Sequence, residues 1–154
     1  MGIILIEDTR NKIDKHRNVH EYCERHGVDI VRLKLDVGDY AFPDGRVAVD
    51  TKQNLEELAR NLMNRSDSSR FWREIRRAYH SKIKLIILCE HGGTIKSLQD
   101  VAKWKSKYGT ASGRWMLNEM LRTERAYGVR WVFCQKKSTG KRIIELLSEE
   151  GQNN

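Results

Sequence analysis

The stretch that decides the fold is VGDYAFPDGRVAVDTK, residues 37–52 of a chain of 154 residues. Its central PDGR is typical of a tight turn, because proline fixes one backbone angle and glycine tolerates a positive φ. The apolar segments on either side have the length and composition of strands. They predict a β-hairpin with Asp39 on one strand and with Asp50 and Lys52 at the end of the other.

The segments on both sides of this hairpin alternate between strand and helix patterns. Apolar runs at 2–6, 84–89 and 129–134 predict buried strands, and the alternation over 28–42 predicts one long half-buried strand. Amphipathic patterns predict helices at 12–26, from 55 onward, at 69–79, 97–103, 114–127 and 139–148. This order indicates a single α/β domain over residues 1–154, with a mixed central β-sheet flanked by helices.

Composition narrows the class of protein. Hydrophobic residues make up 39% of the chain, and no apolar run approaches the ~20 residues that span a bilayer. The N-terminal segment lacks the features of a signal peptide. Three cysteines lie far apart in apolar surroundings, which favours reduced core thiols over disulfides. We therefore expect a cytoplasmic protein, or a nuclear one in a eukaryote, that is not secreted and has no membrane partner.

The net charge of +8 is unevenly distributed. Residues 80–154 hold fourteen Lys or Arg against seven Asp or Glu, whereas residues 1–79 are nearly balanced. A basic half suggests a polyanionic partner, most often nucleic acid. Charge alone is equally compatible with a basic protein that has no such partner.

Three aspartates are expected at or near strand ends: Asp8, Asp39 and Asp50. The hairpin brings Asp39 and Asp50 onto neighbouring strands, and Asp50 and Lys52 project from one face of their strand. Carboxylates that converge repel each other unless a cation lies between them, and oxygen ligands select Mg²⁺ or Mn²⁺. A nearby lysine can stabilise the charge that develops on a phosphate. The set favours metal-assisted phosphodiester hydrolysis, although any single aspartate is more simply a strand-end residue in water.

The ordered segments IEDTR, GVDIVRLKLDVGDY and VAVDTKQNLEEL resemble the nuclease domain of the XPF family of structure-specific endonucleases, within the PD-(D/E)XK superfamily. Asp8 matches the first aspartate of that family, and Gly38-Asp39-Tyr40 matches its GDY motif. Asp50-Thr51-Lys52 stands where the family has Glu-Arg-Lys, and Glu56 stands where it has a later aspartate. RFWREIRRAY followed by KLIILCE continues the resemblance, which ends before the family's helix-hairpin-helix module.

The resemblance implies a restriction-endonuclease-like fold and a Mg²⁺- or Mn²⁺-dependent DNA endonuclease that acts on branched or junction-containing DNA. Asp8, Asp39 and Asp50 would bind the metal, Lys52 would orient the attacking water or stabilise the pentavalent phosphate, and Glu56 would hold that water or Lys52. It also implies a homodimer or a heterologous partner that supplies DNA specificity. The alternative is a non-catalytic subunit of the same fold that binds DNA or an active partner.

Candidate DNA contacts lie mainly in KWKSKYGTASGRW, residues 103–115, where basic and aromatic side chains alternate. Such a mixture suits phosphate contact and base stacking, although the aromatic residues could instead be core residues and the lysines solvated. Arg70 either contacts phosphate or forms an exposed pair with Glu74. The candidates are Arg70, Lys103, Trp104, Lys105, Lys107, Arg114 and Lys141.

Overall fold

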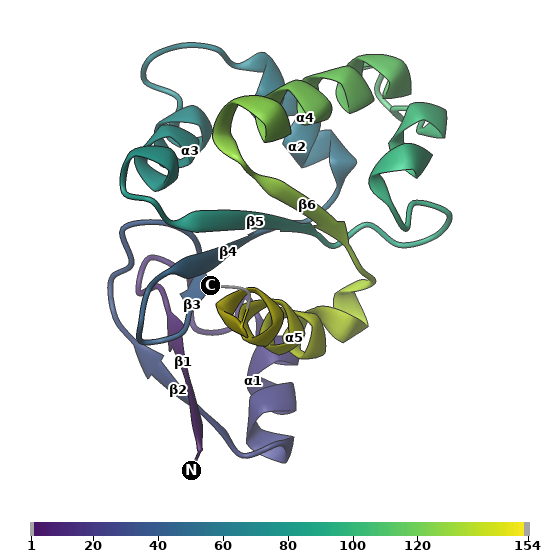
Figure 1. Cartoon of the computed structure of the whole chain (residues 1–154). Helices are drawn as coiled ribbons and strands as arrows, with labels where there is room; N and C mark the ends of the chain where they lie inside the picture. Colours follow the sequence, from purple (N-terminus) through teal and green to yellow (C-terminus); the bar gives the residue numbers. More distant parts are fainter. Residues whose placement is uncertain (1, 153–154) are drawn as a thin grey trace.

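A mixed β-sheet runs through the middle of the computed structural model, which describes residues 2–152 (Figure 1). Within these residues six strands pair in the order β2-β1-β3-β4-β5-β6. The short β3 is antiparallel to both of its neighbours, and the other pairs are parallel. The strands are β1 Ile3–Glu7, β2 Val28–Arg32, β3 Tyr40–Ala41, β4 Val47–Lys52, β5 Lys84–Cys89 and β6 Arg130–Phe133. The expected α/β fold with a mixed sheet is confirmed.

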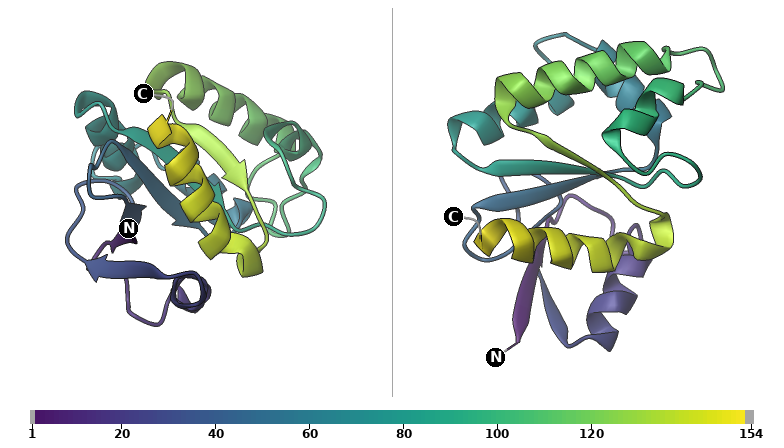
Figure 2. Two further views of the ribbon diagram at one scale, coloured as in Figure 1. Left: turned by 60° about the horizontal axis from the view of Figure 1, so that its bottom comes forward. Right: turned by 45° about the vertical axis from the view of Figure 1, so that its right-hand side comes forward.

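Helices cover the two faces of the sheet in two separate layers (Figures 1 and 2). One layer contains α2 (Leu55–Met63), α3 (Arg70–His80), the 3-10 helix η1 (Leu98–Lys103) and α4 (Gly113–Tyr127). The other contains α1 (Arg17–Arg25) and α5 (Thr139–Gln152), with the short η2 (Lys136–Ser138) leading into α5. A buried apolar cluster fills the space between the sheet and each layer.

The alternation of side chains along β4 decides which layer receives its polar end. Val47 and Val49 belong to the apolar cluster beneath α1 and α5, whereas Ala48 belongs to the cluster beneath α2 and α3. Because side chains alternate with a period of two, Asp50 and Lys52 share the face of Ala48. The end of β4 therefore directs these two polar side chains toward α2 and α3.

The expectation of one continuous strand over residues 28–42 is wrong. β2 ends at Arg32, and the chain forms an irregular loop before β3 begins at Tyr40. Leu33 in this loop is 52% exposed, so the apolar alternation did not reflect burial. The backbone carbonyls of Leu35 and Asp36 accept hydrogen bonds from arginine side chains instead. Long-range contacts thus replace strand pairing here.

Several helix starts follow from capping residues in the sequence. The side chains of Asn54, Ser69 and Ser112 accept hydrogen bonds from backbone N–H groups in the first turns of α2, α3 and α4. The first helix is shorter than the expected 12–26, since α1 begins only at Arg17. The expected helix at 97–103 is a 3-10 helix.

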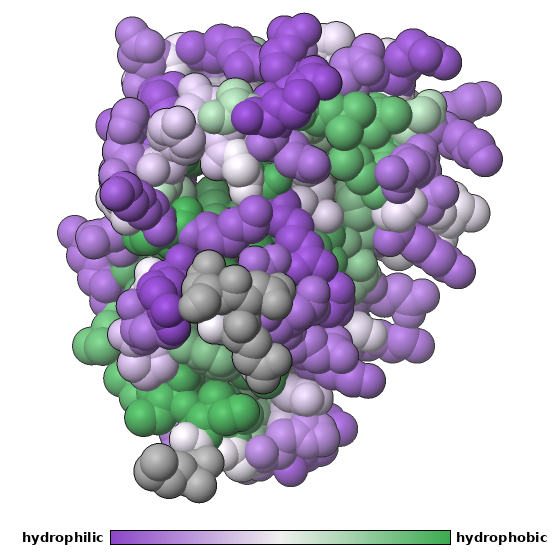
Figure 3. All heavy atoms as spheres, viewed as in Figure 1, coloured by the Kyte–Doolittle hydropathy of each residue, from purple (hydrophilic) through white to green (hydrophobic). Residues whose placement is uncertain are grey.

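Three further features of the fold concern membrane-spanning helices, the surface and the cysteines. No helix within residues 2–152 is long and apolar enough to cross a membrane. Figure 3 shows an apolar patch over the N-terminal strands, where Ile4 and Val31 are 42% and 40% exposed. The three cysteines are free thiols; Cys23 and Cys89 are buried, and Cys134 is partly buried.

Candidate active site

A polar cleft of about 430 Å³ lies where the end of β4 meets α2, α3 and the loop after β1. Its cationic lining residues are Arg10, Lys15, Lys52, Arg70, Arg73 and Arg77. Its acidic lining residues are Asp39, Asp50, Glu57 and Glu74. Carboxylates are thus combined with a larger set of cations, which suits a cleft for an anionic ligand.

Asp39 is held between β1 and β4 by its backbone and its side chain. Its N–H donates to the Val49 carbonyl over 2.8 Å, and its carbonyl accepts from the Asp8 N–H over 2.8 Å. The preceding Gly38 has a φ of +79°, and a Cβ there would lie 3.0 Å from the Val49 carbonyl oxygen. Glycine therefore permits the close approach that places Asp39 beside β4.

The Asp39 carboxylate is well supplied with hydrogen-bond donors. Oδ2 accepts from the Thr51 N–H over 2.9 Å and from Thr51 Oγ1 over 2.7 Å, and Oδ1 accepts from Asn11 Nδ2 over 3.2 Å. Burial alone would raise the pKa of Asp39, but these hydrogen bonds outweigh it and lower the pKa below its ordinary value. Asp39 is therefore an anion at neutral pH.

Asp50 and Lys52 lie together at the end of β4, as their spacing predicts. Lys52 Nζ is 3.4 Å from Asp50 Oδ2, and Asp50 is only 8% exposed. Burial and the nearby Asp39 charge raise the pKa of Asp50 well above its ordinary value, although Lys52 acts in the opposite direction. The pKa of Lys52 is raised, because the charges of Asp50, Glu57 and Glu74 outweigh its burial. Lys52 is thus protonated, while Asp50 is harder to ionise than an ordinary aspartate.

Glu74 is the site residue that the sequence did not suggest. It projects from α3 into the cleft, where the Gly38 N–H and the Asp50 carboxyl group are near enough to act on its pKa. Burial raises its pKa, with the Asp39 charge adding to the effect and Lys52 opposing it. The available signal was its position three residues after Phe71 and four before Ala78, both buried, which places a charge on the apolar face of the helix.

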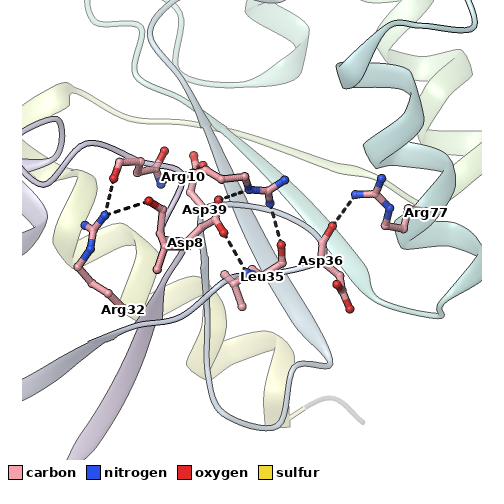
Figure 4. Close-up of polar contacts among 9 residues, drawn as sticks. Asp8, Arg10, Arg32, Leu35, Asp36, Asp39 and Arg77 are labelled. Carbon is pink, nitrogen blue, oxygen red and sulfur yellow. Dashed lines mark hydrogen bonds and ion pairs between the residues drawn. The ribbon is translucent and has the colours of Figure 1, made fainter.

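Asp8 lies beside this group, but its carboxylate has other partners (Figure 4). Oδ2 accepts from Arg10 Nε over 2.7 Å, and Oδ1 accepts from the Leu35 N–H over 2.9 Å. Among the described residues, Asp8 is not part of the cleft lining, whereas Arg10 is. The structure therefore connects Asp8 to the site through Arg10.

Two arginines hold the loop that precedes Asp39 (Figure 4). Arg10 donates to the Leu35 carbonyl over 2.7 Å, and Arg77 on α3 donates to the Asp36 carbonyl over 2.8 Å. Both guanidinium groups line the cleft. The loop is thus fixed by the same cations that surround the carboxylates.

The structure does not bring Glu56 to the other carboxylates, contrary to the expectation from the family motif. Its carboxylate accepts hydrogen bonds from Ser106 and from Thr110 Oγ1, the latter over 2.8 Å. The next residue, Glu57, lies 3.9 Å from Lys52 Nζ instead. Successive side chains on an α-helix are about 100° apart, so adjacent glutamates face different neighbours. Glu57 occupies the place beside Lys52 that was expected for Glu56.

The candidate DNA contacts separate into three groups. Arg70 lines the cleft, and no ion pair joins it to Glu74 among the described residues. Trp104 is 9% exposed and packs in the core beneath α4, so the expectation that it stacks on DNA bases is wrong. The exposed cations of the 103–115 segment are Lys103, Lys105, Lys107 and Arg114, whereas Lys141 is exposed on α5 in the opposite layer.

A second buried carboxylate lies on the opposite face of the sheet. Glu7 is 1% exposed, and its oxygens accept from Tyr40 Oη over 2.5 Å and from Arg32. His20 Nε2 lies 2.8 Å from the same carboxylate. Arg32 also donates to the Asn11 carbonyl, so this cluster supports the loop whose Asn11 side chain contacts Asp39.

Among residues 2–152, no group of three or more His, Cys, Asp and Glu side chains has the arrangement of a metal site. The Asp39, Asp50 and Glu74 carboxylates share one cleft, but hydrogen bonds from Thr51 and Asn11 occupy Asp39, and the Lys52 ammonium lies against Asp50.

Comparison with known proteins gives a family and a fold. The model of the ERCC4 domain family matches residues 8–147. No curated protein matches the chain. The solved structure of XPF from Aeropyrum pernix is similar with a TM-score of 0.69 and 18% identity, covering 96% of this chain. The same protein in complex with DNA gives a TM-score of 0.67 and 19% identity, covering 99% of this chain.

This chain spans just under two thirds of those two solved chains, 65% and 66% respectively. The family match extends from Asp8, directly after β1, to Leu147 in α5, and so includes every strand that contributes to the cleft. It confirms the resemblance to an XPF-type nuclease domain that the GDY motif and its neighbours indicate in the sequence. The chain belongs to the ERCC4 domain family.

Proposed function

We propose that this protein is a divalent-cation-dependent DNA endonuclease that hydrolyses phosphodiester bonds in branched or junction-containing DNA. The observation that carries the proposal is the association of Asp39, Asp50 and Glu74 with Lys52 at the base of a cleft whose other cations outnumber its acids. Burial raises the pKa of Asp50 and Glu74, and the nearby Asp39 charge adds to the effect. Such a cluster costs folding free energy that a bound cation would recover.

The chemistry of the donor set fits Mg²⁺ or Mn²⁺, since all three acidic groups offer hard oxygen ligands. Asp39, Asp50 and Glu74 would hold the ion, and Asp8 would assist by fixing Arg10. Bound there, the ion would supply positive charge that offsets the negative charge developing on the phosphate.

The side chains around the carboxylates have distinct expected roles. Arg10, Arg70 and Arg77 would bind and orient the phosphate backbone, because guanidinium groups recognise phosphate oxygens in a bidentate manner. Lys52 stays protonated beside Asp50 and would stabilise the pentavalent phosphate or orient the attacking water. Glu57, which lies near Lys52, would fix the orientation of its ammonium group.

One observation favours a second candidate, a non-catalytic subunit that binds DNA or an active partner. No group of three carboxylate, imidazole or thiol side chains in residues 2–152 has the arrangement of a metal site. The presence of Lys52 beside two acidic side chains supports the catalytic candidate, because a binding module has no need of a buried lysine among carboxylates.

Single-turnover cleavage assays distinguish the endonuclease from the non-catalytic subunit. Saturating protein would be mixed with labelled flap, fork, four-way-junction and linear duplex DNA, with Mg²⁺, with Mn²⁺ or with EDTA. The proposal expects cation-dependent cleavage of at least one branched substrate and its loss in Asp50→Asn. Binding of all substrates without cleavage in any cation would favour the non-catalytic subunit.

A further inference from the structure

The segment between η1 and α4, residues 104–112, forms a projecting loop that is fixed at both ends. Trp104 is buried at its start, and Lys105 and Ser112 pair as an isolated β-bridge across its base. The following Gly113 leaves no room for a Cβ, which would lie 2.5 Å from the Val101 carbonyl oxygen and 2.6 Å from that of Trp104. The base of the loop is therefore rigidly seated on η1.

Glu56 holds the body of the loop. Its carboxylate accepts hydrogen bonds from Ser106 and Thr110, the latter over 2.8 Å. The Thr110 N–H donates to Ser106 Oγ over 2.9 Å within the loop. One carboxylate thus gathers two donors of a five-residue segment, which gives the tip a defined conformation.

The tip presents side chains that make few contacts with the rest of the molecule. Tyr108 is 73% exposed, the largest value among the exposed large hydrophobic residues in the described part of the chain. Lys107 Nζ lies 5.7 Å from the centre of the Tyr108 ring, and Lys105 is exposed beside them. An exposed aromatic ring flanked by lysines is the combination that binds single-stranded nucleic acid, by stacking on a base while cations contact phosphates.

The position of the loop relates it to the cleft. Glu56 and Glu57 are neighbours in the first turn of α2; Glu56 holds the loop, and Glu57 lines the cleft beside Lys52. The loop and the cleft are therefore connected through the first turn of α2. The structure offers no comparable role for Trp104, whose ring is buried.

We propose that Tyr108 stacks on an unpaired base of the DNA and that Glu56 is the positioning residue that holds the 104–112 loop for this contact. The inference rests on the proposed function only in taking DNA as the ligand. It names the feature recognised, an unpaired strand beside the cleft, and it requires neither a metal ion nor cleavage.

The test measures binding in EDTA, so that failure of catalysis cannot affect it. Fluorescence anisotropy would give the Kd of labelled oligothymidine and of a duplex of equal length for wild type, Tyr108→Ala, Tyr108→Phe and Glu56→Ala. Tyr79→Ala is the matched control, since Tyr79 is another exposed tyrosine, 53% exposed on α3. Thermal melting of each variant would show that it is folded.

Tyr108→Ala should weaken binding of the single strand on the order of tenfold, as expected for loss of one stacked base, and leave duplex binding within about twofold. Tyr108→Phe should retain wild-type affinity, because the phenyl ring still stacks. Glu56→Ala should reproduce the loss for the single strand, and adding Tyr108→Ala to it should cause little further loss, because both changes remove one contact. Thr110→Val, which deletes one donor to Glu56, should give a smaller loss in the same direction.

Four results would overturn the inference. They are unchanged single-strand affinity in folded Tyr108→Ala, an equal loss for duplex and single strand, an equal loss in Tyr79→Ala, or no measurable binding of oligothymidine by wild type. If these assays support the stacking contact while no DNA is cleaved in any cation, the inference stands and the catalytic proposal fails. If cleavage is observed but Tyr108→Ala binds oligothymidine as wild type does, the reverse holds.

Discussion

Two buried carboxylates on opposite faces of the same sheet have opposite surroundings. Glu7 at the end of β1 is 1% exposed and is met by donors from Tyr40, His20 and Arg32. Asp50 in β4 is 8% exposed and is met by the acceptors Asp39 and Glu74, with Lys52 3.4 Å away. One carboxylate has its hydrogen-bonding capacity satisfied by donors, and the other shares its buried site with two further acids and a single cation.

The difference distinguishes buried carboxylates that stabilise the fold from buried carboxylates that are candidates for ligand binding. Burial of a carboxylate is tolerated when donors replace the lost water, as around Glu7. Around Asp50 the same burial is combined with repulsion from Asp39; both raise the pKa of Asp50, and the Lys52 charge offsets them only in part. A buried carboxylate left in this condition is a candidate for binding a cation.

The largest expected effect is on the free energy of unfolding and concerns Glu7, the carboxylate whose hydrogen-bonding capacity is satisfied. Glu7→Gln leaves the Arg32 guanidinium without its anionic partner and should destabilise the fold by about 3 kcal/mol, the scale for breaking a buried ion pair. Urea unfolding would measure it. The control is Glu149→Gln, since Glu149 is an exposed partner of Arg130 and should matter by less than about 1 kcal/mol. Equal stabilities for both variants would mean that the Glu7 cluster does not support the fold.

The next effect is on the cleavage rate and concerns Lys52, on the opposite face of the sheet from Glu7. Lys52→Ala should slow single-turnover cleavage on the order of 10²-fold or more under conditions where urea unfolding shows the variant to be folded, while DNA binding changes little. Lys52→Arg should rescue poorly, because its planar head group cannot replace a compact ammonium. Lys82→Ala, a change in the exposed turn after α3, serves as the control. Cleavage that survives Lys52→Ala at the wild-type rate would remove this lysine from the reaction.

A third, smaller effect tests the assignment of Glu74. Millimolar Mn²⁺ should raise the melting temperature of wild type, because a ligand that binds only the folded state stabilises it. Glu74→Gln should lower this gain, and Asp39→Asn should abolish it. Calorimetry of Mn²⁺ binding provides a second readout. An undiminished gain in Glu74→Gln would show that the ion, if bound, has no ligand on α3.

The smallest expected effect is a gain in stability, whereas Glu7→Gln should cause a loss. In EDTA, Asp50→Asn should stabilise the protein by about 1 kcal/mol, because burial and the Asp39 charge oppose ionisation of Asp50 by more than Lys52 favours it, and an amide needs no ionisation. A carboxyl group whose folded pKa is raised loses stability as the pH rises above its unfolded value, so the gain of the variant should grow between pH 5 and pH 8. Urea unfolding at both pH values would measure it. Destabilisation by Asp50→Asn at pH 8 would mean that Asp50 is satisfied in the way Glu7 is.

The sequence predicted the parts of the site that depend on short spacing. Asp50 and Lys52 share a face because they are two positions apart on one strand, and the turn at 43–46 places Asp39 on the neighbouring segment. Capping residues predicted the starts of α2, α3 and α4. These features depend on residues that are close together in the sequence, so the sequence alone predicts them.

The features that the sequence did not predict depend on contacts between distant segments. Glu74 reaches the site because α3 packs with its Phe71 face on the sheet, more than twenty residues after Asp50. Glu56 and Glu57 are equivalent acids in the sequence, and only the orientation of α2 separates the one at the cleft from the one at the loop. The strand expected over 28–42 fails for the same reason, since Arg10 and Arg77 take the carbonyls of Leu35 and Asp36.

The three free thiols differ in burial, so the rates at which they are alkylated can report local unfolding of the protein. Burial raises the pKa of Cys23 to about 11 and raises that of Cys89 further, so neither presents a thiolate to an alkylating reagent at pH 8. The partly buried Cys134 is the most accessible of the three. Mass spectrometry after timed alkylation should therefore show one early modification and two late ones, and the late pair, from opposite layers of the sheet, would time the opening of each layer.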